Sequence, residues 1–189
     1  MSNAVNPIIA GLLERRSCRA FKPEQIAEES IRAVIEAGRF AATAMALQPQ
    51  CFTVVQNQAL LGRIAAIVKR GYAAMDDERS RQHAANPDYH TFYKAPTVIF
   101  VSADPAAKYG EADCANAVQN MAVAAHSLGL GSCYIAAMRL AFAGADGPAL
   151  KKELGLPDNY AVHFALALGQ AAAAPAQPAP RRQTVDWVN

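Results

Sequence analysis

Apolar residues recur three and four positions apart in four stretches of the chain, which is the spacing of an amphipathic helix. In the second stretch, Ile31, Val34, Ile35 and Phe40 fall on one face. A shorter helix is expected over residues 146–154, closed by Gly155. The four main helices are expected to begin at Asn6-Pro7, near Glu28, after Asn57 and near Glu111.

Four other segments have the pattern of strands. Residues 96–101 form a nearly continuous apolar run, which is typical of a strand covered on both faces. Three further segments are expected to be extended: residues 51–55, 131–138 and 160–168. Helices outnumber strands, and the strands are few and central. The pattern therefore predicts a three-layer α/β or α+β domain.

Two segments break the pattern. Residues 76–94 mix charges, histidines, a proline and aromatic residues without periodicity, so we expect a lid or surface excursion there. Residues 170–180 are rich in alanine and proline, and three prolines oppose a stable helix. We therefore expect one domain over residues 1–189, with an extended tail over about 170–189.

Composition and charge narrow the function classes. The formal net charge of +2 and the absence of a continuous basic stripe argue against a nucleic-acid binder. No apolar run reaches the roughly 18 residues that cross a membrane, and no leader pattern opens the chain. The four cysteines form no CxxC pair and have no histidine at metal-ligand spacing. We therefore expect a cytoplasmic protein with free thiols and no metal, and with no nucleic acid or membrane as partner.

An arginine cluster follows the first helix. Arg15, Arg16 and Arg19 flank Ser17 and Cys18, and Arg181-Arg182 stands near the other end of the chain. Guanidinium groups bind phosphate oxygens in pairs, and a serine hydroxyl adds a further contact. Alone, such a cluster is also typical of a solvated helix end. If Cys18 is exposed, its charged neighbours are expected to lower the pKa of its thiol.

Common nucleotide and catalytic motifs are missing. Gly129-Leu-Gly131 lacks a third glycine and follows a helix, so it does not match a dinucleotide-binding loop. It matches the end of a helix followed by a tight turn. The chain contains no P-loop, HExxH or GxSxG sequence, and His126 is expected to be an ordinary helix histidine.

Seven short segments, taken in order, resemble the FMN-dependent nitroreductase family nearly from end to end. They are Arg15-Arg-Ser-Cys-Arg-Ala-Phe21, Leu47-Gln-Pro49 with Phe52, Ala95-Pro-Thr-Val-Ile99, Asp113 through Asn120-Met121 into Gly129-Leu-Gly-Ser-Cys-Tyr-Ile135, Gly155-Leu-Pro157, Gly169 and Arg181-Arg182.

This resemblance implies an α+β, three-layer nitroreductase-like fold. Its central mixed, mostly antiparallel sheet is flanked by helices, and an extended C-terminal arm is exchanged in a homodimer with two FMN sites at the interface. It also implies an FMN-dependent NAD(P)H oxidoreductase. In such an enzyme, hydride would pass to flavin N5, and a nitroaromatic, a quinone or a similar small electron acceptor would then be reduced by ping-pong turnover.

The resemblance also assigns cofactor-binding residues. Arg15, Ser17 and Arg19 would contact the phosphate, ribityl chain and pyrimidine edge of FMN, with Arg19 stabilising the reduced ring. Arg16 belongs to the same set, although it is the member most compatible with solvent. Arg181 and Arg182 would return from the tail to the phosphate.

Two further segments complete the implied site. Tyr134-Ile135-Ala136-Ala137 would run beside the flavin, with the Ala136 N–H facing N5 and no side chain acting as a catalytic group. Thr43 and Gln48 would lie near the ring. The chain departs from the family at Met45-Ala46, where Gly-Asn is common, and at Gln50, where an aromatic residue is common. These departures leave the acceptor open.

Three alternatives remain. Within the fold, the chain is also compatible with a dehalogenase, a flavin-fragmenting enzyme or a ring-oxidising enzyme. In another class, it is compatible with a flavin-storage protein that has no turnover. A structural protein without flavin would require the arginines to be ordinary surface charges.

Overall fold

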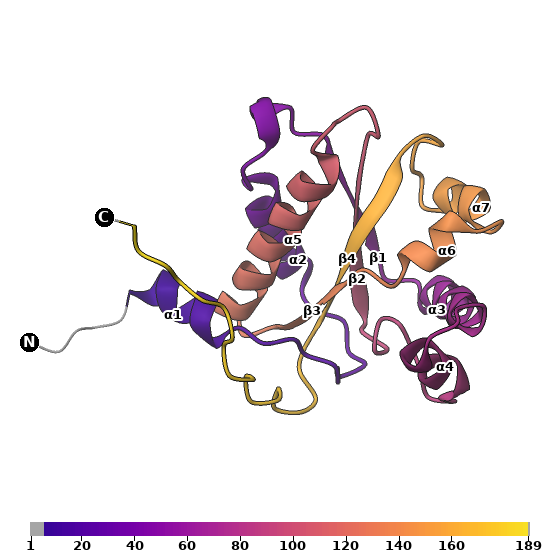
Figure 1. Ribbon diagram of the computed structural model, residues 1–189, viewed down its shortest axis with the longest axis horizontal. Helices are drawn as coiled ribbons and strands as arrows, with labels where there is room; N and C mark the ends of the chain where they lie inside the picture. The colour runs from indigo at the N-terminus through magenta and orange to yellow at the C-terminus, as the bar shows by residue number, and fades with distance from the viewer. Residues whose placement is uncertain (1–5, 189) are drawn as a thin grey trace, which may run out of the picture.

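A four-stranded antiparallel sheet stands between two layers of helices in the computed structural model, which describes residues 6–188 (Figure 1). The strands occur in the order β1-β2-β4-β3. Their bounds are β1 Gln50–Val55, β2 Thr97–Ala103, β3 Gly131–Ile135 and β4 Ala161–Gly169. The expected three-layer α+β architecture is confirmed. The four strands pair only antiparallel, and the described part of the chain has a single parallel contact, the bridge between Ser17 and Ser132.

Helices cover both faces of the sheet. The first face carries α2 (Glu28–Arg39) and α5 (Gly110–Ser127), and Figure 1 shows the second face covered by the other core helices. These are α3 (Gln58–Ala73), α4 (Glu78–Ala85), α6 (Arg139–Ala143) and α7 (Gly147–Glu153). Strand β2 is buried along its whole length, as its apolar run predicts. Its Ile99 and Val101 pack in the core beneath α2 and α5, and Val98 and Phe100 pack in the opposite core, because successive side chains of a strand alternate between faces.

Predicted helix ends agree with the observed ones where a side chain or glycine sets them. The Asn57 Oδ1 atom accepts a hydrogen bond from the Leu60 N–H at 3.1 Å, which caps α3. Gly129 and Gly155 follow α5 and α7 with φ of 71° and 68°, the left-handed conformation that ends a helix.

Two apolar surfaces are more exposed than the pattern suggests. Helix α1 (Pro7–Glu14) has no buried residue, and Ile8 and Leu13 are 69% and 63% exposed. Phe40, which the apolar spacing places on the same face as Ile31 and Val34, is 80% exposed. Phe40 is the C-cap residue of α2, where the chain leaves the helix and the helical periodicity no longer sets its direction.

Two short helices were not predicted. Residues 76–94 contain α4, whose N-cap Asp77 accepts a hydrogen bond from the Ser80 N–H at 2.9 Å. This segment has little apolar content, so its helix leaves no hydrophobic stripe in the sequence. Helix α6, which packs on α3, is only five residues long. A single 3-10 turn, η1 (Ala44–Ala46), precedes β1.

Residues 170–188 of the C-terminal tail form neither helix nor strand, apart from an isolated bridge between Phe21 and Ala171. Its residues from 171 to 188 are exposed, as expected for an extended segment. In Figure 1 the yellow tail runs past α1 toward the C-terminus. The outer ends of the expected domain, residues 1–5 and 189, lie outside the described residues. No helix in the described range is both long and apolar enough to cross a membrane.

Candidate functional site

Residues 15–19, which we call the arginine segment, run along the outer edge of the sheet. The Cys18 N–H donates to the Ser132 carbonyl oxygen of β3 at 2.8 Å, and Ser17 forms the parallel bridge with Ser132. Further on, the Lys22 N–H donates to the Gln170 carbonyl oxygen at 2.9 Å. Backbone pairing therefore fixes the segment beside β3.

Arg15 and Arg16 are both half-buried, but their polar atoms differ. The Arg16 Nη1 atom donates to the Leu13 and Arg15 carbonyl oxygens at 2.6 and 2.8 Å. The Arg15 Nε atom is buried and has no hydrogen-bond partner among the described residues. Since buried donors are nearly always paired, this atom indicates a place for an acceptor from outside the chain.

Arg19 faces an aromatic ring. Its guanidinium carbon lies 5.9 Å from the centroid of the Tyr93 ring. The Tyr93 side chain is the largest influence on the pKa of Arg19 and raises it, while partial burial opposes this. Arg19 therefore stays charged.

A cavity of about 480 Å³, which we call the Arg19 cleft, joins the two ends of the predicted site. Arg19 lines it together with four residues at the end of β3 and beyond: Tyr134, Ile135, Ala136 and Ala137. Its opposite wall comes from α3, α4 and the turn before β2, through Tyr72, Arg79, His83, Tyr89, Thr91 and Tyr93. The structure thus brings together residues more than 110 positions apart in the sequence, as the resemblance implies.

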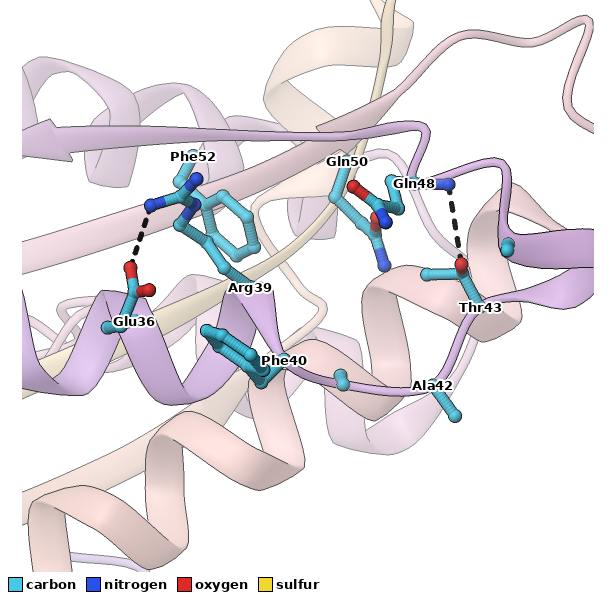
Figure 2. A pocket seen from close by; sticks show the side chains of 10 residues that line it. Glu36, Arg39, Phe40, Ala42, Thr43, Gln48, Gln50 and Phe52 are labelled. Atoms are coloured by element: carbon cyan, nitrogen blue, oxygen red, sulfur yellow. Dashed lines mark hydrogen bonds and ion pairs between the residues drawn. The ribbon is translucent and has the colours of Figure 1, made fainter.

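Thr43 and Gln48 lie elsewhere, in a cavity of about 590 Å³ that we call the Thr43 pocket (Figure 2). The Thr43 Oγ1 atom accepts a hydrogen bond from the Gln48 N–H at 3.3 Å. Phe40, Gln50 and Phe52 also line this pocket. Within one chain, Thr43 and Gln48 therefore do not join Arg19 in its cleft.

The loop of the Thr43 pocket has an unusual backbone. Met45, Ala46 and Gln48 have φ of 54°, 54° and 49°, which is costly for residues other than glycine. Asp113, buried on α5, holds the loop: its Oδ1 atom accepts a hydrogen bond from the Ala44 N–H at 2.9 Å. A buried side chain on a long helix thus stabilises a strained loop on the surface.

Arg181 and Arg182 are both exposed in the tail, and neither lines the Arg19 cleft or the Thr43 pocket. Cys18 is buried rather than exposed, and its thiol donates to the Ala20 carbonyl oxygen at 3.1 Å. The condition for a reactive Cys18 is therefore not met. Burial raises the pKa of the neighbouring Cys133 thiol, which also argues against a thiolate here.

Residues before β2 contribute more than the sequence indicated. The sequence predicts a lid or surface excursion over residues 76–94, but it does not single out Tyr93 among the aromatic residues of this segment. Tyr89 and Tyr93 line the cleft, whereas Phe92 is fully buried in the core. Tyr89, Tyr93 and Phe92 all have aromatic side chains. The backbone of the turn decides which of them line the cleft and which is buried in the core.

Comparison with known proteins gives a consistent result. The family model described as "Nitroreductase family" matches residues 12–170. The NADPH-flavin oxidoreductase of Vibrio harveyi is 29% identical over 173 residues, which cover 87% of this chain and 66% of that protein. This chain thus spans slightly less than two thirds of that relative.

Solved structures match over nearly the whole chain. The crystal structure of a nitroreductase with bound FMN from Bacteroides fragilis has a TM-score of 0.89 and 31% identity, covering 98% of this chain and 100% of that one. A nitroreductase with bound FMN from Desulfitobacterium hafniense has a TM-score of 0.90 and 31% identity, with the same coverage. The family model covers most of the chain, and the chain therefore belongs to the nitroreductase family.

Proposed function

We propose that this chain binds FMN and is an FMN-dependent NAD(P)H oxidoreductase that reduces an electron-poor acceptor such as a nitroaromatic compound or a quinone. The buried, unpartnered Nε atom of Arg15 is the observation that carries the proposal. A phosphate oxygen is the kind of acceptor that satisfies a buried guanidinium donor. The FMN in the two similar crystal structures and the name of the Vibrio relative support the same cofactor and activity.

The residues of the arginine segment have separate parts in this site. Arg15 and Ser17 would hold the phosphate, because Arg15 has an unused buried donor and Ser17 lies beside it against β3. Arg19 would face the ring from the cleft that it shares with residues 134–137. Arg16 is a weaker candidate, since two carbonyl oxygens already occupy its Nη1 atom.

The cleft residues would bind and orient two substrates in turn. FMN, when bound, supplies the ring nitrogen that accepts a hydride from a nicotinamide. The positive charge of Arg19 favours the electron-rich reduced state of the ring. Ala136 is exposed and has a small side chain, so its N–H would leave room for a planar molecule.

We further propose that the active form is a homodimer. The apolar side of α1 is exposed in the single chain, and Val185 and Trp187 of the tail are exposed as well. Pairing of two copies would cover these side chains. The Thr43 pocket and the tail would then reach the Arg19 cleft of the other copy, which accounts for the separation of Thr43, Gln48, Arg181 and Arg182 from Arg19 in one chain.

We also propose that residues 1–189 form one domain, that segment 76–94 covers the cleft as a lid, and that the tail embraces the partner. The four cysteines are unpaired, which supports a reducing compartment such as the cytoplasm.

The visible spectrum tests the cofactor directly. The purified protein, mixed with FMN and separated from free FMN, is expected to keep flavin absorbance, and NADH or NADPH is expected to bleach it without oxygen. A colourless protein contradicts FMN binding. Flavin that binds but is not bleached leaves the cofactor site standing and contradicts the reductase activity.

The dimer has its own test. Light scattering after gel filtration is expected to give twice the mass of the 20.1 kDa chain. Truncation before Pro180 is expected to release FMN and to weaken the dimer. A truncated chain that retains FMN as tightly as the full chain contradicts the role of Arg181 and Arg182.

A further inference from the structure

We infer that Tyr93 is a positioning residue for the flavin site, because it sets the direction of the Arg19 guanidinium in the cleft. This inference rests on the proposed function, since its effect is on bound FMN. Tyr93 is not proposed to touch the reacting atoms.

Arg19 depends on Tyr93 for its orientation. The side chain of Arg19 is exposed and forms no ion pair with an acidic side chain among residues 6–188. A long side chain in such a position has several rotamers of similar energy. The Tyr93 ring, 5.9 Å from the guanidinium carbon, is the contact that favours one of them.

The other aromatic residues of the cleft are engaged with each other. The Tyr72, His83 and Tyr89 rings lie with their centroids 5.0 to 5.6 Å apart. The Tyr89 hydroxyl is within 2.7 Å of the Thr91 Oγ1 atom. Among the aromatic residues of the cleft, Tyr93 is therefore the one in contact with Arg19.

The backbone holds Tyr93 in a costly conformation. Tyr93 and Lys94 have φ of 54° and 55°, and left-handed residues other than glycine cost on the order of 1 kcal/mol or more each. Such conformations persist only when the surrounding structure enforces them.

Several contacts enforce this turn. The Tyr93 N–H donates to the His90 carbonyl oxygen at 2.8 Å, and the His90 Nδ1 atom accepts hydrogen bonds from the N–H groups of Phe92 and Lys94 at 3.2 and 3.3 Å. Phe92 is fully buried, which anchors the turn in the core. The turn thus carries one aromatic side chain into the core and presents the next to Arg19.

This arrangement has a consequence for the redox potential. If Tyr93 directs Arg19 toward the ring, loss of Tyr93 should weaken the binding of reduced FMN more than the binding of oxidised FMN. The midpoint potential of bound FMN measures this difference and does not depend on the acceptor. A residue with a merely structural role would weaken both forms equally and would leave the potential unchanged.

The experiment measures that potential in the protein loaded with FMN. Tyr93→Phe removes the hydroxyl and keeps the ring, and Tyr93→Leu removes both. Because Tyr93→Phe keeps the ring contact, we expect the preference for reduced over oxidised FMN to fall about tenfold in Tyr93→Leu and much less in Tyr93→Phe. For a two-electron couple, tenfold corresponds to a potential about 30 mV more negative.

Tyr109→Phe and Tyr109→Leu are matched controls. The Tyr109 ring also faces a cation, Lys108, with the ammonium nitrogen 5.3 Å from the ring centroid, and Tyr109 lines neither the Arg19 cleft nor the Thr43 pocket. We expect both control variants to keep the wild-type potential.

A double-mutant cycle shows whether Tyr93 acts through Arg19. Arg19→Gln alone should make the potential more negative, and adding Tyr93→Leu should shift it no further. An unchanged potential in Tyr93→Leu, or a shift that adds fully to that of Arg19→Gln, overturns the inference. If Tyr93→Leu does not fold, Tyr93→Met, which also removes the ring, takes its place. A wild-type chain that binds no FMN contradicts the proposed function itself, so the two failures are distinct.

Discussion

Replacing Arg15 by alanine tests whether this arginine binds FMN or only supports the structure. The Arg15 Nε atom is buried without a partner among the described residues, whereas Arg16 already donates to two carbonyl oxygens. An unsatisfied buried donor costs about 1–3 kcal/mol, and a phosphate oxygen would remove that cost. Arg15 should therefore matter for FMN binding, and Arg16 much less.

The expected size follows from the type of hydrogen bond. A hydrogen bond to a charged group contributes about 1.5–3 kcal/mol, which corresponds to a rise in the Kd for FMN of roughly 10- to 150-fold. Without FMN, Arg15→Ala removes no hydrogen bond made by Nε and relieves an unsatisfied buried donor, so the free energy of unfolding should not fall. With FMN at 100 times the wild-type Kd, binding stabilises the wild type by about 2.7 kcal/mol. A variant with a Kd raised about 100-fold would keep only about 0.4 kcal/mol of that.

Two measurements on the same proteins test this reasoning. Titration of flavin fluorescence gives the Kd, and urea unfolding with and without FMN gives the stability. Arg16→Ala is the matched control, with a Kd near that of the wild type. Equal loss of affinity in both variants would refute the distinction between the two arginines. A large loss of stability without FMN in Arg15→Ala would show that Arg15 is structural.

Three further predictions concern side chains outside the arginine segment. Burial, and then the charge of Lys94, lower the pKa of His90 below its ordinary 6.5, so the unfolded chain takes up a proton first as the pH falls. His90 should therefore reduce stability below about pH 6.5 and not above it, and urea unfolding from pH 5 to 8 should show a smaller acid loss in His90→Asn. Asn57→Ala removes the cap of α3 and should lower the free energy of unfolding by about 1 kcal/mol in the same assay. Asp113→Ala removes the acceptor for the Ala44 N–H and should cost about 1.5–3 kcal/mol, with faster proteolysis of the loop at residues 43–48. Asp113→Asn keeps an acceptor oxygen, and a loss as large as that of Asp113→Ala would contradict the hydrogen-bond explanation.

Most of the fold could be predicted because its main elements carry their own signals. The apolar run of β2, the cap at Asn57 and the helix-ending Gly129 are local features, and each is found where the sequence indicates. Helices α4 and α6 have no such signal. Helix α6 is five residues long and packs on α3, so tertiary contacts rather than sequence pattern determine it.

The candidate site was predictable only in part. Arg19 and Ala136 share a cleft because the arginine segment pairs with β3, a contact that spacing along the chain does not reveal. Tyr93 had no distinguishing signal, since its orientation depends on two left-handed residues in the turn before β2. Thr43 and Arg181 lie away from that cleft, and their assigned roles require a second copy of the chain.

The pairing of the arginine segment with β3 also affects aggregation. Strand β3 stands at one end of the sheet order, and an edge strand with free N–H and C=O groups can recruit a strand from another molecule. Ser17 and Cys18 occupy part of that edge through the bridge and the hydrogen bond to Ser132. The segment proposed to hold the cofactor thus also shields the sheet. A variant that loosens this segment would lose flavin and, at the same time, expose a surface on which chains can polymerise, even though both hydrophobic cores remain intact.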